Sequence, residues 1–424
     1  MATIKEIKDG ALHHVYRGLY GSSHDQHDQD RRYLALAEEH LRRFGEHTVS
    51  LFSTAGRSEL GGNHTDHNLG LVIAATITLD TIAAVSRRED NTVRLISEGY
   101  PAVEVDLTNL EKVPHEENTT EALVRGIAFA FKERGLSIGG WQANTSSRVL
   151  KGSGLSSSAA IEVLCATIFN HLFNDDTLDP IDLAIIGKFA ENHYFGKPSG
   201  LMDQLACGYG GIVGIDFADE QNPTVTPIPV SFSDWGYHLV IVDTGGNHAN
   251  LTPEYASVPI EMRQVASFFD KEQLREVAYN DFFSSIKAVR ESINNDRAVL
   301  RAIHFFEENR RVEAMLHALA NENIDAYLDL VNKSGESSFC FLQNLYPTTL
   351  PSEQGLSLAI ALTKSILGSD VAVRVHGGGF AGTIQAYVRD EELEYYVKEM
   401  ETVFGCGSAT VIEIRSKATA CIAD

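Results

Sequence analysis

Four polar, glycine-containing stretches of the chain hold the residue types that can do chemistry. In the first, residues 56–70 read GRSELGGNHTDHNLG and directly precede the apolar run VIAATITL. Arginine, acid, histidine and asparagine side chains offer many hydrogen-bond donors and acceptors in a short space. Beside a buried strand they are typical either of a solvated loop or of a pocket for a polyhydroxylated ligand.

The second stretch, KGSGLSSSAAIEV at residues 151–163, combines glycines and serines between a strand pattern and a helix pattern. Such a turn exposes backbone N–H groups at a helix N-terminus, where the helix dipole also favours an anion. The hydroxyls add bonds to phosphate oxygens or ligate Mg²⁺. The stretch is not a Walker A loop, because the G-x-x-x-x-G-K-[ST] spacing is absent. A plain serine N-cap after a glycine turn explains it equally well.

Two acids and a run of glycines complete the candidates. Glu191 and Asp203 lie in ENHYFGKPSGLMDQLACGYGG, and Asp203 has apolar neighbours. An acid in that company is either a helix N-cap or a site carboxylate. Residues 373–388, VRVHGGGFAGTIQAYV, place three glycines between two strand patterns. Glycines there allow close approach to a ligand or to the first glycine-rich loop, and a tight hairpin is the alternative.

The elements that must position these residues alternate between helix and strand, which predicts an α+β fold. Helices are expected up to residue 45, at 157–173, through much of 255–335, at 353–366 and at 391–404. Strands are expected near 49–53, 71–79, 92–97, 103–107, 145–150, 237–244, 371–375, 383–388 and 409–414. The proline-rich segment 219–233 is the best candidate for a linker between two lobes, so the expected lobes are residues 1–218 and 234–424.

Composition narrows the functional classes. The net charge of −23 argues against nucleic-acid binding but allows a locally bound anion such as ATP. Five cysteines without a CxxC pair indicate a reducing compartment. The first residues lack the apolar core of a signal peptide, and no apolar run is long enough to span a membrane. We therefore expect a cytoplasmic protein that makes no membrane contact.

Together and in this order, the motifs resemble those of the GHMP kinase superfamily, and within it the galactokinases. Residues 56–70 resemble the sugar signature GRVNLIGEHTDYNxG, residues 151–163 the phosphate loop P-x-G-x-GLSSSAA, and residues 377–382 the closing motif GGGFGG. The GLMDQ, AEN and NLTPEY stretches also match. The resemblance covers most of the chain. It implies a two-lobed α+β fold with mixed sheets, packed helices and an active site between the lobes. It also implies Mg²⁺- and ATP-dependent phosphorylation of the C1 hydroxyl of galactose.

The resemblance also implies roles for individual residues. Asp203 corresponds to the catalytic aspartate beside the anomeric hydroxyl, and Arg57 to the arginine that stabilises it and the charge of the transferred group. The ATP phosphates are expected at Gly152, Ser153, Gly154, Leu155, Ser156, Ser157, Ser158 and Ala159. Mg²⁺ is expected at Ser158 and Glu191. The sugar-binding positions are Asn63, His64, Asp66, Gly200 and Tyr255.

Several positions depart from the family pattern. Asn63 replaces the signature glutamate that faces the primary-hydroxyl end of the sugar, which we expect to change the local charge by one unit. Other departures include Ala55, His67, His376 and Ala381. None involves the expected catalytic pair, so they bear on sugar preference. Two alternatives therefore remain: a kinase for another sugar such as N-acetylgalactosamine, and a non-catalytic galactose and ATP sensor. The intact GLSSSAA segment favours a kinase.

Overall fold

A nine-stranded sheet forms the first half of the protein. The computed structural model describes residues 2–21, 24–149, 154–197, 199–246 and 251–424. The strand order is β1-β2-β3-β6-β4-β5, with β13 on β2, β7 on β3 and β8 on β7. Among the described strand pairs of this sheet, only β4–β6 is parallel. The strands are β1 (Ala2–Thr3), β2 (Thr48–Gly61), β3 (Leu71–Arg87), β4 (Thr92–Ser97), β5 (Val103–Asp106), β6 (Trp141–Ser147), β7 (Ile212–Asp216), β8 (Thr224–Ile228) and β13 (Ala420–Ala423).

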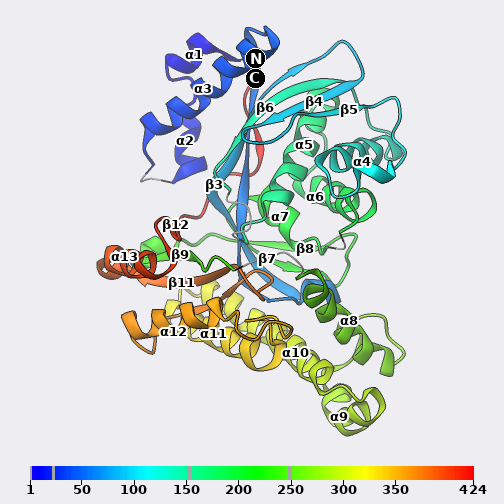
Figure 1. The fold of residues 1–424 in the computed structure, drawn as a ribbon, viewed down its shortest axis with the longest axis vertical. Coiled ribbons are helices and arrows are strands. Elements are labelled where there is room, and N and C mark those ends of the chain that lie inside the picture. Colours follow the sequence, from blue (N-terminus) through cyan, green and yellow to red (C-terminus); the bar gives the residue numbers. More distant parts are fainter. Residues whose placement is uncertain (1, 22–23, 150–153, 198, 247–250) are drawn as a thin grey trace.

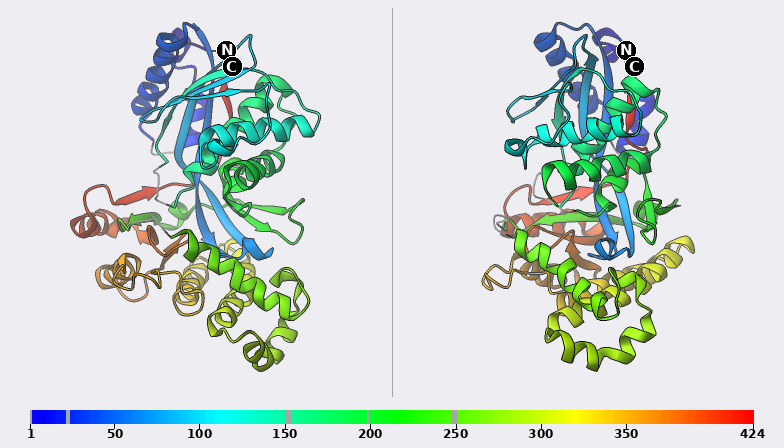
Figure 2. Two further views of the ribbon diagram at one scale, coloured as in Figure 1. Left: turned by 45° about the vertical axis from the view of Figure 1, so that its right-hand side comes forward. Right: turned by 90° about the vertical axis from the view of Figure 1, so that its right-hand side faces the viewer.

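Helices cover both faces of this sheet, as Figures 1 and 2 show. Side chains alternate between faces along a strand. On β3, Ile82 and Ala84 therefore pack with the N-terminal helices, whereas Ala83 and Val85 pack with the helices opposite. The N-terminal helices are α1 (Ile4–Lys8), α2 (His13–Tyr20) and α3 (Gln26–Phe44). The others are α4 (Thr120–Glu133), α5 (Ser157–Asn174) and α6 (Pro180–Ala190), with α7 (Met202–Tyr209) against β3 and β7.

A second, four-stranded antiparallel sheet has the order β10-β11-β9-β12. Its strands are β9 (Tyr237–Asp243), β10 (Val373–His376), β11 (Thr383–Arg389) and β12 (Ala409–Ile412). The helices of this half are α8 (Thr252–Phe268), α9 (Tyr279–Ile293), α10 (Asp296–Ala320), α11 (Ile324–Ser337), α12 (Gly355–Leu367) and α13 (Leu393–Phe404).

The two halves share a hydrophobic core. Val240 and Val242 of β9 face α12 and α13, while Leu239 and Ile241 face the side covered by α10 and α11. Leu60 at the far end of β2 belongs to that second cluster. The long strands β2 and β3 thus run from the N-terminal helices to the helices of the second half (Figure 1).

The helix predicted at 157–173 and the strand predicted at 237–244 are confirmed. Two expectations need correction. The expected strand at 49–53 continues to Gly61, so the first part of the polar stretch 56–70 is strand rather than loop. The segment 219–233 is not an irregular linker, because it contains β8, which pairs with β7. The two-lobe division at that segment stays a prediction, and β13 returns from the C-terminal half to β2.

Candidate active site

An arginine–aspartate ion pair lies at the centre of the candidate site. Arg57 comes from β2 and Asp203 from the first turn of α7. Nε of Arg57 donates to Oδ1 of Asp203 at 2.8 Å. The Arg57 side chain is only 6% exposed, whereas that of Asp203 is 33% exposed. Asp203 is therefore held by a buried cation and still accessible to a ligand.

The serine-rich loop, which is the part of residues 151–163 that precedes α5, contacts both members of this ion pair. Arg57 also donates through Nη1 to the carbonyl oxygen of Gly154, and its backbone N–H to that of Leu155 at 3.1 Å. Oγ of Ser156 donates to Oδ2 of Asp203 at 2.7 Å. A Cβ on Gly56 would lie 2.9 Å from the Leu155 carbonyl oxygen, so the close approach requires glycine. The first two sequence motifs are thus joined at Asp203.

These contacts fix the charge of Asp203. Burial alone would raise the pKa of this carboxyl, but the Arg57 guanidinium and the Ser156 hydroxyl bring the pKa down to about 2. Asp203 is therefore ionised at neutral pH and a weak base. A carboxylate of this kind orients a hydroxyl and accepts its proton late, which suits a loose phosphoryl-transfer transition state.

The start of α5 leaves backbone donors available for an anion. Ser156 precedes the helix in the left-handed region, with φ of 60°, and no side chain caps the helix. The Ser156 hydroxyl instead binds Asp203, so the plain N-cap interpretation is wrong. Ser157 is half-buried and Ser158 exposed. The free N–H groups here suit phosphate. Gly152 and Ser153 lie outside the described residues.

A second group of carboxylates lies beside Asp203. Glu191 begins a π-helical turn, Glu191–Phe195, and is buried. Nζ of Lys197 donates to its Oε1 at 2.6 Å, and the Ser199 hydroxyl and Gln204 amide donate to its Oε2. Lys197 and Asp203 also interact electrostatically, because each shifts the pKa of the other toward its charged form.

Glu162 is the acid that the sequence analysis missed. It lies one turn after Ser158 on α5, and Nε2 of Gln204 donates to its Oε2 at 2.8 Å. Its Oε1 is buried and makes no hydrogen bond within the described part of the chain. Burial and the neighbouring Glu191 raise the pKa of Glu162 well above its usual range. The i+4 spacing from Ser158 was the available signal.

This arrangement fits the magnesium ion that the resemblance implies. Carboxylate and hydroxyl oxygens are the ligands that Mg²⁺ prefers in proteins. Glu191, the exposed Ser158 hydroxyl and the unpartnered Glu162 oxygen are such donors. The Lys197 ammonium on Glu191 indicates that this carboxylate already attracts a cation.

The triple-glycine loop accepts hydrogen bonds from three predicted sugar-binding residues in succession. Nδ2 of Asn63 donates to the Gly377 carbonyl oxygen at 2.7 Å. Nε2 of His64 donates to that of Gly378 at 2.8 Å, and the Tyr255 hydroxyl to that of Gly379 at 2.9 Å. A Cβ on Gly378 would lie 2.6 Å from the Tyr255 ring. The glycines therefore let the loop approach the sugar motif.

The same loop lies beside the serine-rich loop. A Cβ on Gly154 would lie 3.2 Å from Nδ1 of His376, the residue that precedes the three glycines. His376 also contacts Ser58 of β2 through Nε2 at 3.1 Å. The stretches 56–70, 151–163 and 373–388 thus meet in one region, because His376 contacts Ser58 and lies beside Gly154.

Asp66 and Gly200 are also brought together. A Cβ on Gly200 would lie 2.0 Å from Oδ2 of Asp66, so only glycine permits this contact. His64 supplies a further open group: its Nδ1 is buried without a hydrogen-bond partner in the described structure. Because Nε2 carries the proton given to Gly378, Nδ1 is an acceptor suited to a ligand hydroxyl.

Burial, with His67 nearby, lowers the pKa of His64 to about 3. The unfolded chain binds a proton below about pH 6.5 that the native His64 does not, so stability falls as pH drops from about 6.5 toward 3. We expect His64→Asn to reduce that slope by up to about 1.4 kcal/mol per pH unit. Urea unfolding of both proteins at pH 8, 6 and 5 checks this, and parallel pH dependences would contradict it.

Asn63 belongs to a buried polar network. Its Nδ2 also donates to Oε1 of Glu59 at 3.1 Å, and its Oδ1 accepts from Nδ2 of Asn344 at 2.8 Å. Arg374 of β10 donates to the same Glu59 carboxylate. The signature has asparagine where this chain has Glu59 and glutamate where it has Asn63. The carboxylate and the amide have therefore exchanged places, and the expected loss of one local charge does not occur.

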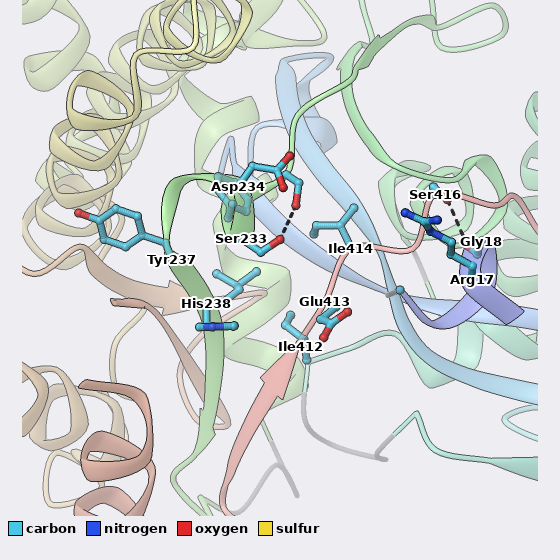
Figure 3. Close-up of a pocket in the computed structure, with 14 residues that line it drawn as sticks. Arg17, Gly18, Ser233, Asp234, Tyr237, His238, Ile412, Glu413, Ile414 and Ser416 are labelled. Carbon is cyan, nitrogen blue, oxygen red and sulfur yellow. Dashed lines mark hydrogen bonds between the residues drawn. The ribbon is translucent and has the colours of Figure 1, made fainter. Parts of the chain in front are cut away.

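A cavity of about 480 Å³ lies elsewhere, between α2, the start of β9 and β12. Figure 3 shows Arg17, Asp234, His238 and Glu413 around it. None of the predicted site residues lines it. The polar groups that converge on Asp203, rather than this cavity, define the candidate site.

The comparisons with known proteins identify the class first. The family model for the GHMP kinases N terminal domain matches residues 122–211, which include the serine-rich loop and Asp203. The model for the galactokinase galactose-binding signature matches residues 38–87, around Arg57 and Asp66. Mevalonate kinase has the same fold, with a TM-score of 0.60 at 16% identity.

The particular family follows from whole-chain similarity. The galactokinase of Streptomyces coelicolor is 31% identical over 365 residues, covering 85% of this chain and 90% of that protein. The Lactococcus lactis galactokinase crystal structure with galactose has a TM-score of 0.79 at 25% identity, covering 91% of this chain and 99% of that one. The chain belongs to the galactokinase family, and its fold is that of the GHMP kinases. Among the described residues, no helix is both long and apolar enough to cross a membrane.

Proposed function

We propose that this protein transfers the γ-phosphoryl group of ATP to the C1 hydroxyl of galactose, giving galactose 1-phosphate and ADP. The observation that carries the proposal is the accessible Asp203 carboxylate, held by buried Arg57 and by Ser156 in front of α5. A hydroxyl-orienting base beside a helix start that suits an anion is what this transfer requires. The similarity to galactokinases supports galactose as the acceptor.

In the proposed reaction, the C1 oxygen of the sugar forms a bond to the γ-phosphorus. The bond from that phosphorus to the β,γ-bridging oxygen breaks, and the electron pair leaves with ADP. Asp203 orients the C1 hydroxyl and takes its proton late. Arg57 keeps Asp203 ionised and balances the charge around the transferred group. Residues 152–159 hold the phosphates through N–H and hydroxyl groups.

Mg²⁺ would be held by Ser158 and Glu191, and when bound it neutralises charge on the phosphates. Glu162 is the buried acid beside Glu191, and the Gln204 side chain donates to both acids. Lys197 is a further cation at this position.

The sugar hydroxyls would be bound by His64, Asp66 and Tyr255, with Gly200 leaving room beside Asp66. Nδ1 of His64 is the open acceptor. Asn63 is fully buried, and its amide already binds Glu59, Gly377 and Asn344. A direct bond from Asn63 to the sugar requires the exchange of one of these partners, so we propose that Asn63 mainly positions the triple-glycine loop.

A sugar panel tests the function. ADP release should be measured with galactose, glucose and N-acetylgalactosamine under the same conditions. Galactose is expected to give the highest kcat/KM. Faster turnover of N-acetylgalactosamine would instead identify the alternative kinase. Binding of galactose and ATP without ADP release from any sugar would identify the sensor.

The exchanged pair Glu59 and Asn63 gives a sharper prediction. Asn63→Glu alone places a second carboxylate against Glu59 in a buried site, and we expect it to destabilise the protein by about 3 kcal/mol or more. The double change Glu59→Asn with Asn63→Glu restores the family order and should recover most of that loss. The free energy of unfolding in urea and the KM for galactose should be measured for the wild type, the single variant and the double variant. A double variant no more stable than Asn63→Glu would contradict the prediction.

The remaining assignments are also part of the proposal. Sugar and ATP are the partners, and the strongly acidic surface gives no support for nucleic-acid binding. All five cysteines are free thiols, which supports placing the protein in the reducing cytoplasm.

A further inference from the structure

A mixed cluster of metal-binding side chains lies at the C-terminal end of α5, away from the candidate active site. It comprises His171 of α5 with Cys421 of β13 and Asp424 just beyond that strand. One ligand atom from each lies within 4.8 Å of the others. His171 is 13 residues after Ser158 on the same helix. At about 1.5 Å per residue, the cluster is roughly 20 Å along the helix from the serine-rich loop.

Each of two potential ligands is held by a second residue. Asp176, just after α5, has its Oδ2 2.8 Å from Nδ1 of His171. This contact orients the ring and leaves Nε2 facing Asp424. The Ser50 hydroxyl donates to Oδ1 of Asp424 at 2.6 Å, so Oδ2 is the oxygen that faces His171. A histidine held by a carboxylate through its other ring nitrogen is the usual outer-shell arrangement at protein metal sites.

The spacing fits a shared metal better than a direct ion pair. Nε2 of His171 is 3.5 Å from Oδ2 of Asp424, whereas a charge-assisted hydrogen bond is about 2.7–2.9 Å long. Two ligands bound tetrahedrally to zinc at about 2.0–2.1 Å lie roughly 3.3–3.4 Å apart. A histidine–aspartate pair also leaves Cys421 without a role, since within the described residues its thiol donates only to the Ala423 carbonyl oxygen, at 3.3 Å.

The surroundings offer space and charge. A cavity of about 390 Å³ is lined by all three residues and by Asp176. Two aspartates and a thiol give the cluster the donor groups that a cation needs. The set of nitrogen, sulfur and oxygen suits zinc and similar divalent transition metals rather than Mg²⁺.

We propose that His171, Cys421 and Asp424 bind one divalent transition-metal ion of the zinc type, with water from the cavity as a fourth ligand. The ion ties β13 to α5, and therefore fixes the strand that pairs with β2 beside Phe52. This site is separate from the Mg²⁺ site of the proposed kinase reaction.

Cobalt(II) tests the proposal, because thiolate coordination gives an intense near-ultraviolet charge-transfer band that oxygen-only sites lack. The full chain is stripped with a chelator and titrated with Co²⁺. We expect one equivalent to produce that band together with the visible bands of tetrahedral cobalt. Zn²⁺ should then remove both and raise the unfolding temperature.

Matched variants separate this site from others. Cys421→Ser and His171→Gln should lose the band, while Cys406→Ser and Cys340→Ser, which change exposed thiols, should keep it. Circular dichroism confirms that each variant is folded. ADP release with galactose should stay close to wild type in Cys421→Ser, so the kinase proposal is tested independently. Absence of the band in the wild type, or its persistence in Cys421→Ser, would overturn the proposal.

Discussion

Asp203→Asn is expected to lower kcat by a factor of about 10²–10⁴, the usual contribution of a positioned acid–base group. The amide keeps the shape of the side chain but neither accepts the proton nor balances the charge of Arg57. Steady-state ADP release with galactose measures the loss. Galactose affinity, measured by calorimetry, should change little, because the ring contacts are assigned to other residues.

Asp182→Asn is the matched control, since this acid lies on the surface of α6 in an exposed pair with Arg134. It should leave kcat unchanged. An Asp203→Asn enzyme with near wild-type kcat would remove Asp203 from its assigned role.

The wild-type rate should also show no acidic limb from Asp203 above about pH 4, because its pKa is about 2. The stability that its depressed pKa contributes is present above the unfolded pKa of about 3.9 and is lost as pH falls toward 2.

The second large effect is expected for Arg374→Met. Arg374 of β10 is fully buried and donates to Glu59 of β2, so it joins the two sheets by a buried ion pair. Removing one partner leaves the other charge buried, and we expect a loss of about 3–5 kcal/mol in the free energy of unfolding. Adding Glu59→Gln should restore part of the loss, because the uncompensated charge disappears. Urea unfolding measures both variants.

Lys287→Met is the control for this pair. Lys287 and Glu291 form an exposed contact at 3.9 Å, and its loss should change stability by no more than about 0.5 kcal/mol. If Arg374→Met cost as little as Lys287→Met, the buried pair would not hold the sheets together.

Short sequence patterns predicted those elements whose ends depend on neighbouring residues in the chain. The helix of α5 begins at Ser157 as expected, because a glycine- and serine-rich turn precedes an apolar helical pattern. The polar end of β2 escaped prediction because its side chains are buried by partners far along the chain. Glu59 meets Arg374, and Asn63 meets Asn344. A sequence shows such residues as polar, and polarity alone predicts solvent.

The site was predicted in the same uneven way. The family resemblance predicted that Arg57 stabilises Asp203, and the two side chains are in contact at 2.8 Å. Glu162 and Lys197 were missed, because one is hidden in a helical pattern and the other resembles a surface lysine. The exchange between Glu59 and Asn63 was visible in the letters, but only their contact makes it one compensated change.

The triple-glycine loop has a consequence for the direction of its peptide groups. A trans peptide is planar, so its C=O and N–H point in opposite directions. The carbonyl oxygens of the three glycines point toward Asn63, His64 and Tyr255. The three amide hydrogens that follow them therefore point away from these side chains. One of them, on Phe380, meets the Asn344 carbonyl oxygen. Gly377 and Gly379 both have positive φ, so they set which way these dipoles face. If one of these peptides were flipped, its N–H would face a side chain that is itself a hydrogen-bond donor.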